Sequence, residues 1–335
     1  MVSSSARPRV AVVGGGIAGL SCARVLQGHG IEVRVLDKGH EEGGRVCTHG
    51  TEDGLSFDHG AQYLTIRDRW FRRMLAPLIE GGTLVRWTGR LAVAGPDGVR
   101  PLSDGEERWI ATPTMSALPR ALAEGLTVDT SVRVTGMRRE GSRWSLEHEH
   151  GLYDGFDRVV LAIPAGQAAE LMREHPGLAG LRSAAEAVVM EPCWTLMLYM
   201  PGVFPTGYDA AFVEGSPLSW AMRQSSKAGR PSYEAWVLHA TATWTRAHWD
   251  DHHLDVTEAM LEAWHERGGP SPRAVSQTMA HRWRQAGVDP HARPRSLGDD
   301  EAGVALAGDW LGGGRVEGAF LSGRKAAAGV LRSLR

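Results

Sequence analysis

Lysine is almost missing from this sequence of 335 residues, which has only Lys38, Lys227 and Lys325 among its 37 basic residues. The basic residues are balanced by 39 acidic ones, so the formal net charge is only −2 at pH 7. A chain without an excess of either charge gives no reason to expect nucleic acid or an anionic membrane surface as its main partner. We therefore expect a small-molecule partner, and a chain that acts as a monomer or homodimer.

Cysteine is scarce and long apolar runs are missing. Cys22, Cys47 and Cys193 are far apart, odd in number and without a C-x-x-C pair, which argues against a disulfide framework or a cysteine metal site. No stretch reaches 18 apolar residues and the N-terminus lacks an apolar signal core, so we expect a cytoplasmic protein without a membrane span. In HWDDHH (248–253) adjacent histidines precede a predicted helix, where they suit caps, and we predict no metal.

Glycine, by contrast, is abundant, and three glycines form the clearest motif near the N-terminus. In RVAVVGGGIAGL (9–20) a continuous apolar run precedes Gly14, Gly16 and Gly19, which have G-x-G-x-x-G spacing. The run is typical of a strand buried on both faces, and the apolar residues after it repeat at helical spacing. The spacing predicts a tight turn at Gly14, close approach of the backbone to a pyrophosphate at Gly16, and close helix–strand packing at Gly19.

The segment after this motif completes a dinucleotide-binding unit. The predicted helix stops at the glycines of QGHG (27–30), and IEVRVLD (31–37) alternates apolar residues before it ends in Asp37. A carboxylate at this distance from the third glycine is expected to accept a hydrogen bond from a ribose hydroxyl. The sequence therefore predicts a Rossmann-like unit for either NAD or FAD.

Two further stretches favour FAD. KGHEEGGRV (38–46) offers a bare turn at Gly44 and the guanidinium of Arg45 to the same pyrophosphate. Near the C-terminus a predicted strand (304–307) leads into Gly308 and Asp309, a glycine loop and a helix over about 317–332. Asp309 would accept a hydrogen bond from a ribityl or ribose hydroxyl, and the helix N-terminus would stabilise negative charge on a reduced flavin. A long cofactor needs such a second contact, so FAD fits better than NAD.

Taken together, these motifs resemble the flavin amine oxidase superfamily. Within it, FDHGAQYLT (57–65), WVLHATATW (236–244) and HRWRQA (281–286) resemble the renalase-like oxidoreductases, especially the bacterial ones. The resemblance implies a two-domain fold of the p-hydroxybenzoate hydroxylase type, noncovalent FAD, and oxidation of a small reduced substrate with O2 as acceptor and hydrogen peroxide as product. It also implies isomeric dihydro-NAD(P) as substrate, with the nicotinamide ring reduced at the wrong carbon.

The same resemblance implies the residues that bind FAD. The backbone of one residue would pair with adenine, the FDHGAQY segment would lie along the isoalloxazine, and the C-terminal motif would reach the ribityl chain and the pyrimidine end. In chain order the implied residues are Gly14, Gly16, Ala18, Gly19, Asp37, Lys38, Gly44, Arg45, Gly60, Ala61, Gln62, Val132 (adenine), Gly308, Asp309, Val316, Glu317 and Gly318.

The substrate pocket is expected to include Tyr63, His239, His281 and Trp283. Because alternate side chains of a strand share a face, His281 and Trp283 point one way and Arg282 and Arg284 the other. In the functional interpretation Trp283 is a wall of the pocket and a histidine bonds to a carboxamide or ribose. In the alternative interpretation Trp283 packs in the core and the arginines form salt bridges.

The chain departs from the amine oxidases of the superfamily in one respect. Those enzymes commonly carry a lysine on a substrate-domain strand, where it holds a water near flavin N5. The matching strand here, EPCWTLMLYM (191–200), has no lysine, and Lys227 lies in a loop instead. This departure weakens an interpretation as a monoamine oxidase.

Composition divides the chain into interleaved segments of two domains. Residues 70–126 and 169–296 hold ten of the 12 tryptophans and strands such as WTLMLYM, which is typical of a mixed-sheet substrate domain. Residues 1–69, 127–168 and 297–335 carry the cofactor motifs and form the predicted FAD-binding domain. The fold class is therefore α/β, with a Rossmann-like domain interleaved with an α+β substrate domain.

Three functions are consistent with these residues. The first is an FAD-dependent oxidase in which a hydride passes from a small reduced substrate to flavin N5. Because a dihydropyridine that loses a hydride becomes an aromatic cation, it needs no base, and no catalytic side chain is predicted. The second is an amine or amino-acid oxidase or a dehydrogenase, including one in a biosynthetic pathway. The third is a flavin- or nucleotide-binding protein without turnover.

Overall fold

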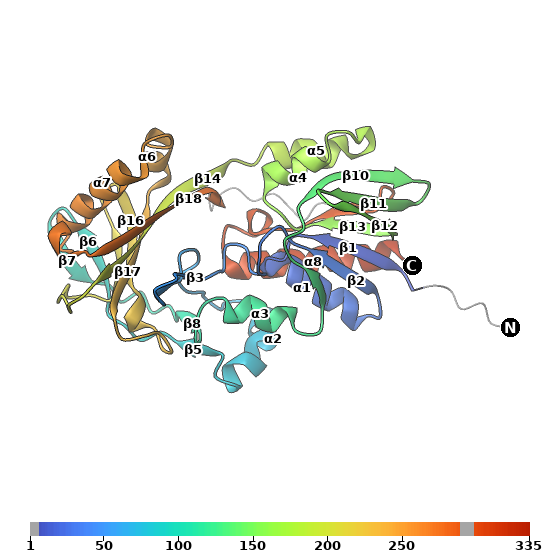
Figure 1. Ribbon diagram of the computed structural model, residues 1–335. Coiled ribbons are helices and arrows are strands. Elements are labelled where there is room, and N and C mark those ends of the chain that lie inside the picture. The colour runs from blue at the N-terminus through green and yellow to red at the C-terminus, as the bar shows by residue number, and fades with distance from the viewer. Residues whose placement is uncertain (1–6, 289–297) are drawn as a thin grey trace.

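A computed structural model describes residues 7–288 and 298–335, and its first sheet is the predicted dinucleotide-binding sheet (Figure 1). The strand order is β19-β20-β13-β1-β2-β9, and only the β19–β20 pair is antiparallel. The strands are β1 (Arg9–Val13), β2 (Glu32–Leu36), β9 (Thr127–Asp129), β13 (Arg158–Leu161), β19 (Gly298–Asp299) and β20 (Val304–Leu306). Strand β1 is buried on both faces, as its continuous apolar run predicts.

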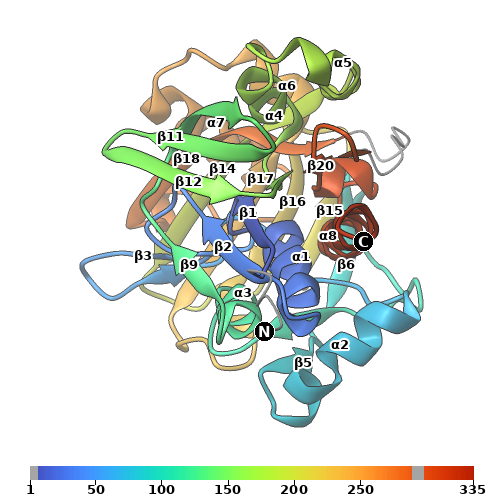
Figure 2. The same ribbon diagram turned by 90° about the vertical axis from the view of Figure 1, so that its right-hand side faces the viewer.

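Two helices, α1 (Ile17–Gly28) and α8 (Val316–Ser333), cover one face of this sheet and pack against each other (Figure 2). Gly323 permits the contact, because a Cβ at that position would lie 1.9 Å from the carbonyl oxygen of Ala18. The opposite face carries an antiparallel sheet and two helices: β10 (Val134–Glu140), β11 (Arg143–His148), β12 (Gly151–Phe156), α4 (Ala165–Leu171) and α5 (Ala179–Glu186). Strands β10 and β11 form a hairpin, and β12 pairs with β11 as the third strand.

The second large sheet lies at the other end of the molecule (Figure 1). Its order is β18-β14-β17-β16-β15-β6-β7, and only the β15–β6 pair is parallel. The strands are β6 (Leu91–Gly95), β7 (Gly98–Pro101), β14 (Met190–Met200), β15 (Ala210–Val213), β16 (Leu218–Arg223), β17 (Glu234–Ala240) and β18 (Gln277–Val288). The sheet is mixed, as the sequence predicts.

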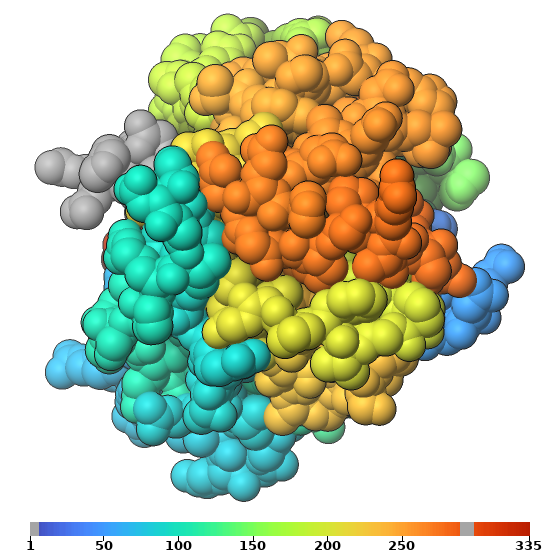
Figure 3. Space-filling model, turned by 90° about the vertical axis from the view of Figure 1, so that its left-hand side faces the viewer, coloured from blue at the N-terminus to red at the C-terminus, as the bar shows by residue number. Residues whose placement is uncertain are grey.

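Helices α6 (Ala242–Ala247) and α7 (His253–His265) cover the outer side of this sheet, where Figure 3 shows them in orange. The apolar face of α7 is formed by Val256, Met260, Leu261 and Trp264, which are all buried. His252 caps α7 by accepting the amide of Leu254. Within the described ranges no three metal-ligating side chains are grouped as a metal site would require.

Short elements fill the space between the two large sheets (Figure 1). They are β3 (His49–Gly50), β4 (Ser56–Phe57), α2 (Arg69–Glu80), β5 (Leu84–Arg86), β8 (Trp109–Ala111) and α3 (Ala117–Ala123). Strands β3 and β4 form one ribbon and β5 and β8 another. The FDHGAQY segment begins in β4, and it therefore reaches both halves of the molecule.

The chain crosses between the two large sheets several times. The first sheet takes strands from residues 9–36, 127–161 and 298–306, and the second takes strands from 91–101 and 190–288. This alternation supports the interleaved division that we propose, although the expected boundary between residues 296 and 297 lies outside the described residues. Among the helices of the described ranges, none combines the length and apolarity that a membrane span requires.

Candidate functional site

The glycine motif joins β1 to α1, and each of its glycines meets a different constraint. Gly14 has φ +107°, a conformation that favours glycine, and a Cβ at Gly19 would lie 1.9 Å from the Gly14 carbonyl oxygen. At Gly16, in contrast, the nearest atom to such a Cβ is 3.9 Å away. Helix α1 starts directly after Gly16 without a side-chain cap, so its first N–H groups keep their positive potential for an anion.

The loop of Gly43 and Gly44 lies directly against this motif. The amide of Gly43 donates to the carbonyl of Gly15 (2.9 Å), and a Cβ at Gly44 would lie 3.7 Å from Cα of Gly16. Two bare backbone segments that are distant in sequence thus form one surface, as expected for residues that share a pyrophosphate.

Asp37 directly follows β2 beside the same loop, and its carboxylate accepts hydrogen bonds from the amides of Gly15 (2.5 Å) and Gly39 (2.7 Å). Its carbonyl accepts the amide of Val132 (2.8 Å), so of the backbone groups expected to pair with adenine this N–H is already bonded within the chain. Lys38 instead points to Gln167, with 3.4 Å between Nζ and Oε1.

Arg45 and Asp309, which the sequence places 264 residues apart, form a bidentate ion pair. Nη2 donates to Oδ1 at 2.5 Å and Nη1 to Oδ2 at 3.0 Å. Nη1 also donates to the carbonyl of Ala286 on β18 (3.0 Å). This pair joins the GGR loop, the C-terminal motif and the second sheet at one point.

The FDHGAQY segment continues this surface. The amide of Ala61 donates to the carbonyl of Arg45 (2.9 Å), and a Cβ at Gly60 would lie 2.1 Å from the same oxygen. Gln62 is buried directly after them. The predicted cofactor residues at 14–19, 44–45, 60–62 and 309 are therefore linked by contacts.

His59 connects this surface to the predicted substrate residues. Its carbonyl accepts Nε2 of His239 and Nε1 of Trp283, each at 3.3 Å. Its ring stacks on Trp283, with 4.9 Å between centroids, and meets the edge of His281 at 5.0 Å. We call these four side chains, His59, His239, His281 and Trp283, the histidine wall.

The other face of β18 points away from the histidine wall. The guanidinium carbons of Arg282 and Arg284 lie 4.4 and 5.1 Å from the ring centroid of Trp249. The two faces of this strand therefore separate as the alternation predicts. The arginines pack on an aromatic ring, which differs from the salt bridges of the alternative interpretation.

The wall is uncharged near neutral pH. Burial and, to a smaller extent, the neighbouring imidazoles together lower the pKa of His59 to about 3. Burial also lowers the pKa of His239 to about 4 and lowers that of His281. The wall therefore offers aromatic surface and neutral imidazole nitrogens to a ligand.

Tyr63 lies apart from the wall. Its ring packs against Trp220, with 5.5 Å between centroids, and the guanidinium carbon of Arg108 lies 5.3 Å from its centroid. It belongs to the apolar cluster that contains Trp109 and Phe320. Its assignment to the substrate pocket therefore stays a prediction.

The first residues of α8 contact the segment before α2 and the glycine loop that precedes α8. The carboxylate of Glu317 accepts the amides of Arg67 (2.6 Å) and Asp68 (2.9 Å), and Val316 begins the helix. A Cβ at Gly318 would lie 2.2 Å from the carbonyl oxygen of Gly312, and the Gly308 amide donates to Ser322 Oγ (3.0 Å). These contacts fix the glycine loop that precedes the helix.

A pair of charged residues was missed at the sequence level. Lys227 is fully buried, although its loop composition suggests an exposed residue, and its Nζ lies 3.0 Å from Oδ2 of Asp58. Two features of the sequence could have suggested this pair: lysine is rare in the chain, and Asp58 begins the DHGAQ motif. The pairing itself spans 169 residues, and no local pattern indicates it.

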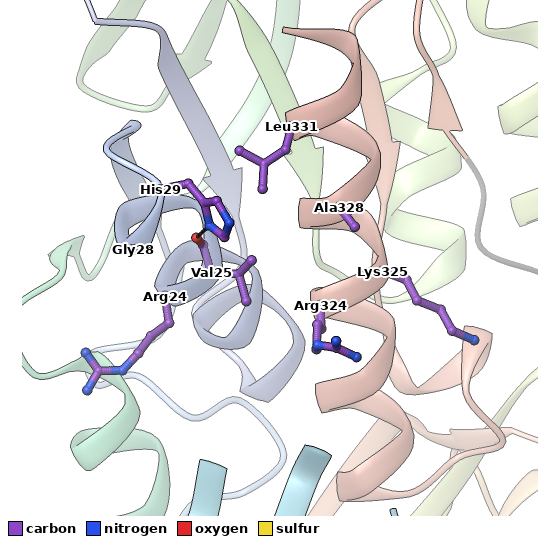
Figure 4. A pocket seen from close by; sticks show the side chains of 8 residues that line it. All are labelled: Arg24, Val25, Gly28, His29, Arg324, Lys325, Ala328 and Leu331. Atoms are coloured by element: carbon purple, nitrogen blue, oxygen red, sulfur yellow. Dashed lines mark hydrogen bonds between the residues drawn. The ribbon is translucent and has the colours of Figure 1, made fainter. Parts of the chain in front are cut away.

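A groove of ≈ 480 Å³ lies on the outside of the first domain, between α1 and α8 (Figure 4). Arg24, Arg324 and Lys325 line it together with apolar residues such as Val25 and Leu331. None of the predicted site residues, all of which the structure describes, lines this groove. It is therefore separate from the candidate site.

The sequence matches two known protein families. Residues 90–331, more than half of the chain, match the family described as flavin containing amine oxidoreductase. The chain belongs to this family. Residues 12–78 match the NAD(P)-binding Rossmann-like domain. The predicted superfamily and the predicted class, an FAD-dependent oxidoreductase, are confirmed.

Individual relatives agree with this family. Renalase of Mus musculus is 24% identical over 310 residues, which cover 84% of this chain and 85% of renalase. One component of the opine oxidase of Rhizobium meliloti (strain 1021) is 28% identical over 352 aligned positions, which cover 96% of this chain and 70% of that component.

Solved structures confirm the fold of this flavin amine oxidoreductase. Cyclohexylamine oxidase from Brevibacterium oxydans IH-35A superposes with a TM-score of 0.76 at 12% identity, covering 98% of this chain and 99% of that one. Putrescine oxidase bound to putrescine gives 0.71 at 11% identity, covering 97% and 99%. The predicted Rossmann-like FAD domain with a substrate domain is therefore correct.

The residues present fit FAD. Bare backbone at Gly16 lies at the uncapped start of α1, where a pyrophosphate binds well, and the guanidinium of Arg45 lies on the adjoining loop. Asp37 is buried directly after β2, the position from which such an acid reaches a ribose.

Proposed function

We propose that this enzyme oxidises a small reduced ring without positive charge, with an isomeric dihydro-NAD(P) as the first candidate and O2 as acceptor. Bound FAD supplies the redox chemistry, since its isoalloxazine ring accepts a hydride and passes the electrons to O2 to give hydrogen peroxide. The protein binds the substrate, orients it and excludes water. The histidine wall is the observation that supports this proposal most directly.

We assign the seventeen predicted cofactor residues to FAD as part of this proposal. The contacts among Gly16, Gly44, Arg45 and Ala61 support it, because they form one continuous surface. The assignment of Val132 is narrowed: its amide is bonded to Asp37, so its carbonyl is the group we propose for adenine.

Electrostatics favour an uncharged or anionic substrate. The imidazoles of the histidine wall are neutral at pH 7, and a neutral wall does not compensate an ammonium ion for its lost hydration. Asp58 directly precedes His59 of the wall, and its carboxylate is ion-paired with two cations, Lys227 and Arg230. A protonated amine would therefore meet no free anion from this group.

A dihydropyridine also matches the chemistry of the wall. Loss of a hydride from such a ring yields an aromatic cation directly, so no side chain has to remove a proton. Catalysis then depends on orientation: Trp283 would stack on the ring, and His239 or His281 would hydrogen-bond to a carboxamide or ribose. The likeness to mouse renalase over most of both chains supports an FAD-dependent oxidoreductase in general, and the dihydropyridine is our proposal.

Anaerobic mixing tests the proposal. Purified enzyme with FAD is mixed with NAD that has been partly reduced by borohydride, which contains the ordinary dihydro form and the two isomers reduced beside the ring nitrogen. We expect fast bleaching of the flavin band by the minor isomers and slow bleaching by the ordinary form. Bleaching by amines or amino acids alone would refute this substrate.

One observation favours a second candidate, an amine or amino-acid oxidase or dehydrogenase. The relative from the Rhizobium meliloti opine oxidase aligns with 96% of this chain. Rapid flavin reduction by amino acids, with none by the dihydro isomers, would establish it. Failure of every donor would indicate a flavin-binding protein without turnover.

A further inference from the structure

Five polar side chains are buried between the FDHGAQY segment and the loop after β16. Two come from the first segment and three from the second: Asp58, Gln62, Gln224, Lys227 and Arg230. We call them the Asp58 cluster. Each of these side chains is almost fully excluded from solvent.

Lys227 is the centre of the Asp58 cluster. Its ammonium group has three N–H donors, and it finds three acceptors: Oδ2 of Asp58 (3.0 Å), Oε1 of Gln62 (3.1 Å) and Oε1 of Gln224 (3.2 Å). No donor remains for a substrate. Lys227 therefore acts through the residues that it holds.

The charges of the Asp58 cluster do not balance. Arg230 also binds Oδ2 of Asp58, from Nη2 at 2.6 Å and Nε at 3.2 Å, so two cations share one carboxylate. Burial of ions is costly, and well-packed apolar side chains often hold two surfaces together at least as firmly. Holding the two segments together is therefore a weak explanation for this cluster. Fixing the orientation of its side chains is a better one.

The cluster fixes the orientation of Gln62. Oε1 of Gln62 accepts from Lys227 and from Nε2 of Gln224 (3.0 Å), so its own Nε2 must face the other way. There it donates to the backbone carbonyls of Asp58 and Gly60, the latter at 3.1 Å. Gln62 thereby closes the turn that carries His59.

That turn touches both halves of the candidate site. The carbonyl of His59 holds His239 and Trp283, while Ala61 is bonded to the backbone of Arg45. A change in the direction of the Gln62 amide would move both contacts together.

We propose that Lys227 is a positioning residue which, through Gln62, sets the turn 58–61 against the histidine wall and against the bound flavin. This inference rests on the proposed function only where it names the flavin edge and the substrate wall. The lowered pKa of Lys227, about 8 because of burial, is consistent with an ammonium ion that the cluster keeps charged at neutral pH.

The test compares Lys227→Met with Lys325→Met, a matched change on the exposed face of α8. The readouts are the visible spectrum and midpoint potential of bound flavin and its anaerobic reduction rate at saturating substrate. We expect Lys227→Met to shift the spectrum and potential and to slow reduction about 10- to 100-fold, because small misplacements cost that much. Lys227→Arg, which keeps the charge, should recover part of the loss, and Lys325→Met should match wild type.

A wild-type spectrum, potential and saturated rate in Lys227→Met, with only a lower Tm, would overturn the proposal. If that variant does not retain FAD, Gln224→Glu decides. It keeps an acceptor for Lys227 and balances the extra charge, but it removes the donor to Gln62. We expect a shifted flavin spectrum, and an unchanged spectrum and rate would refute the role.

The spectrum and the potential, titrated with dithionite, require no substrate. If the dihydro isomers fail to reduce wild type, the proposed substrate is wrong, while these two readouts still decide the role of Lys227.

Discussion

At the scale of single residues, the glycines of the first motif show how one spacing serves different constraints. Gly14 and Gly19 are required by the protein itself, through a positive φ and a contact with the backbone, respectively. Gly16 has ordinary φ and open space around it. Its lack of a side chain is therefore best explained by a ligand.

This contrast gives a first prediction. Gly16→Ala should leave the stability of the FAD-free protein unchanged and weaken FAD binding at least about tenfold, which corresponds to about 1.4 kcal/mol. Gly19→Ala, whose Cβ would lie 1.9 Å from a carbonyl oxygen, should lose about 1–3 kcal/mol of unfolding free energy. FAD titration and urea unfolding measure the two effects, and equal loss of stability in both variants would contradict this distinction.

The buried histidines predict how stability depends on pH. Their ordinary pKa is 6.5, and burial lowers the values of His59 and His239 to about 3 and about 4. Between these values and 6.5 the unfolded chain binds more protons than the folded one. The contribution of these histidines to the free energy of unfolding is therefore fully present above about pH 6.5 and is lost as the pH falls. The loss from His239 should be on the order of 3 kcal/mol near pH 4.

Urea unfolding at a series of pH values checks this prediction. His239→Gln removes one of the titrating groups and should flatten the dependence between pH 6.5 and 4, with His29→Gln, an exposed histidine, as its control. The same slope in wild type and His239→Gln would show that His239 is not the source.

The residue scale also separates what sequence can predict from what it cannot. The roles of Gly14 and Gly19 follow from local spacing, and both are fixed by neighbours within the same unit. The ion pairs Arg45–Asp309 and Lys227–Asp58 join residues 264 and 169 apart, so only the fold brings them together. Asp58 lies within the FDHGAQY motif, but its partner Lys227 lies in a loop that has no sequence pattern.

At the scale of elements, the start of α2 is held from two sides. Asp68 caps it by accepting the amides of Trp70 (2.7 Å) and Phe71 (3.1 Å), and Glu317 of α8 accepts the amides of Arg67 and Asp68. The first contact is local and the second reaches across the chain. Glu317, implied by resemblance to lie at the pyrimidine end, thus also anchors another helix.

Removal of the cap should be measurable. Asp68→Ala should lower the free energy of unfolding by about 1 kcal/mol, and Asp68→Asn, which keeps an acceptor oxygen, should lower it by less. Chemical denaturation of the FAD-free protein compares them, and equal losses would assign the effect to charge rather than to capping.

Elements with strong periodicity could be predicted well. The apolar run of β1 appears where expected, because a strand buried on both faces needs a continuous apolar pattern. Strand β12 (Gly151–Phe156) was not predicted as a separate strand, since its residues are mostly exposed and their pattern is weak. It is formed by pairing with β11, which sequence periodicity does not report.

At the scale of the whole molecule, the site exists because the chain crosses repeatedly between two sheets. Arg45 is an example, since it binds Asp309 from the C-terminal segment and the carbonyl of Ala286 on β18. Composition predicts interleaved segments, but it carries no information on how the two sheets are placed relative to each other.

Arg45→Lys tests this junction. Lysine keeps the charge but cannot form two parallel bonds to a carboxylate, so FAD affinity should fall about tenfold and the FAD-free protein should unfold at a lower temperature. Arg73→Lys, on the exposed side of α2, serves as control. Unchanged FAD affinity in Arg45→Lys would remove this residue from the cofactor site.

We propose, for the whole enzyme, that it positions an uncharged reduced ring against the neutral histidine wall. The most direct measurement is anaerobic reduction of the bound flavin by the separated dihydronicotinamide isomers, beside amines and amino acids at equal concentration. We predict fast bleaching by an isomer reduced beside the ring nitrogen, and slower bleaching when Trp283 is replaced by alanine. Reduction by amines or amino acids alone would contradict the claim.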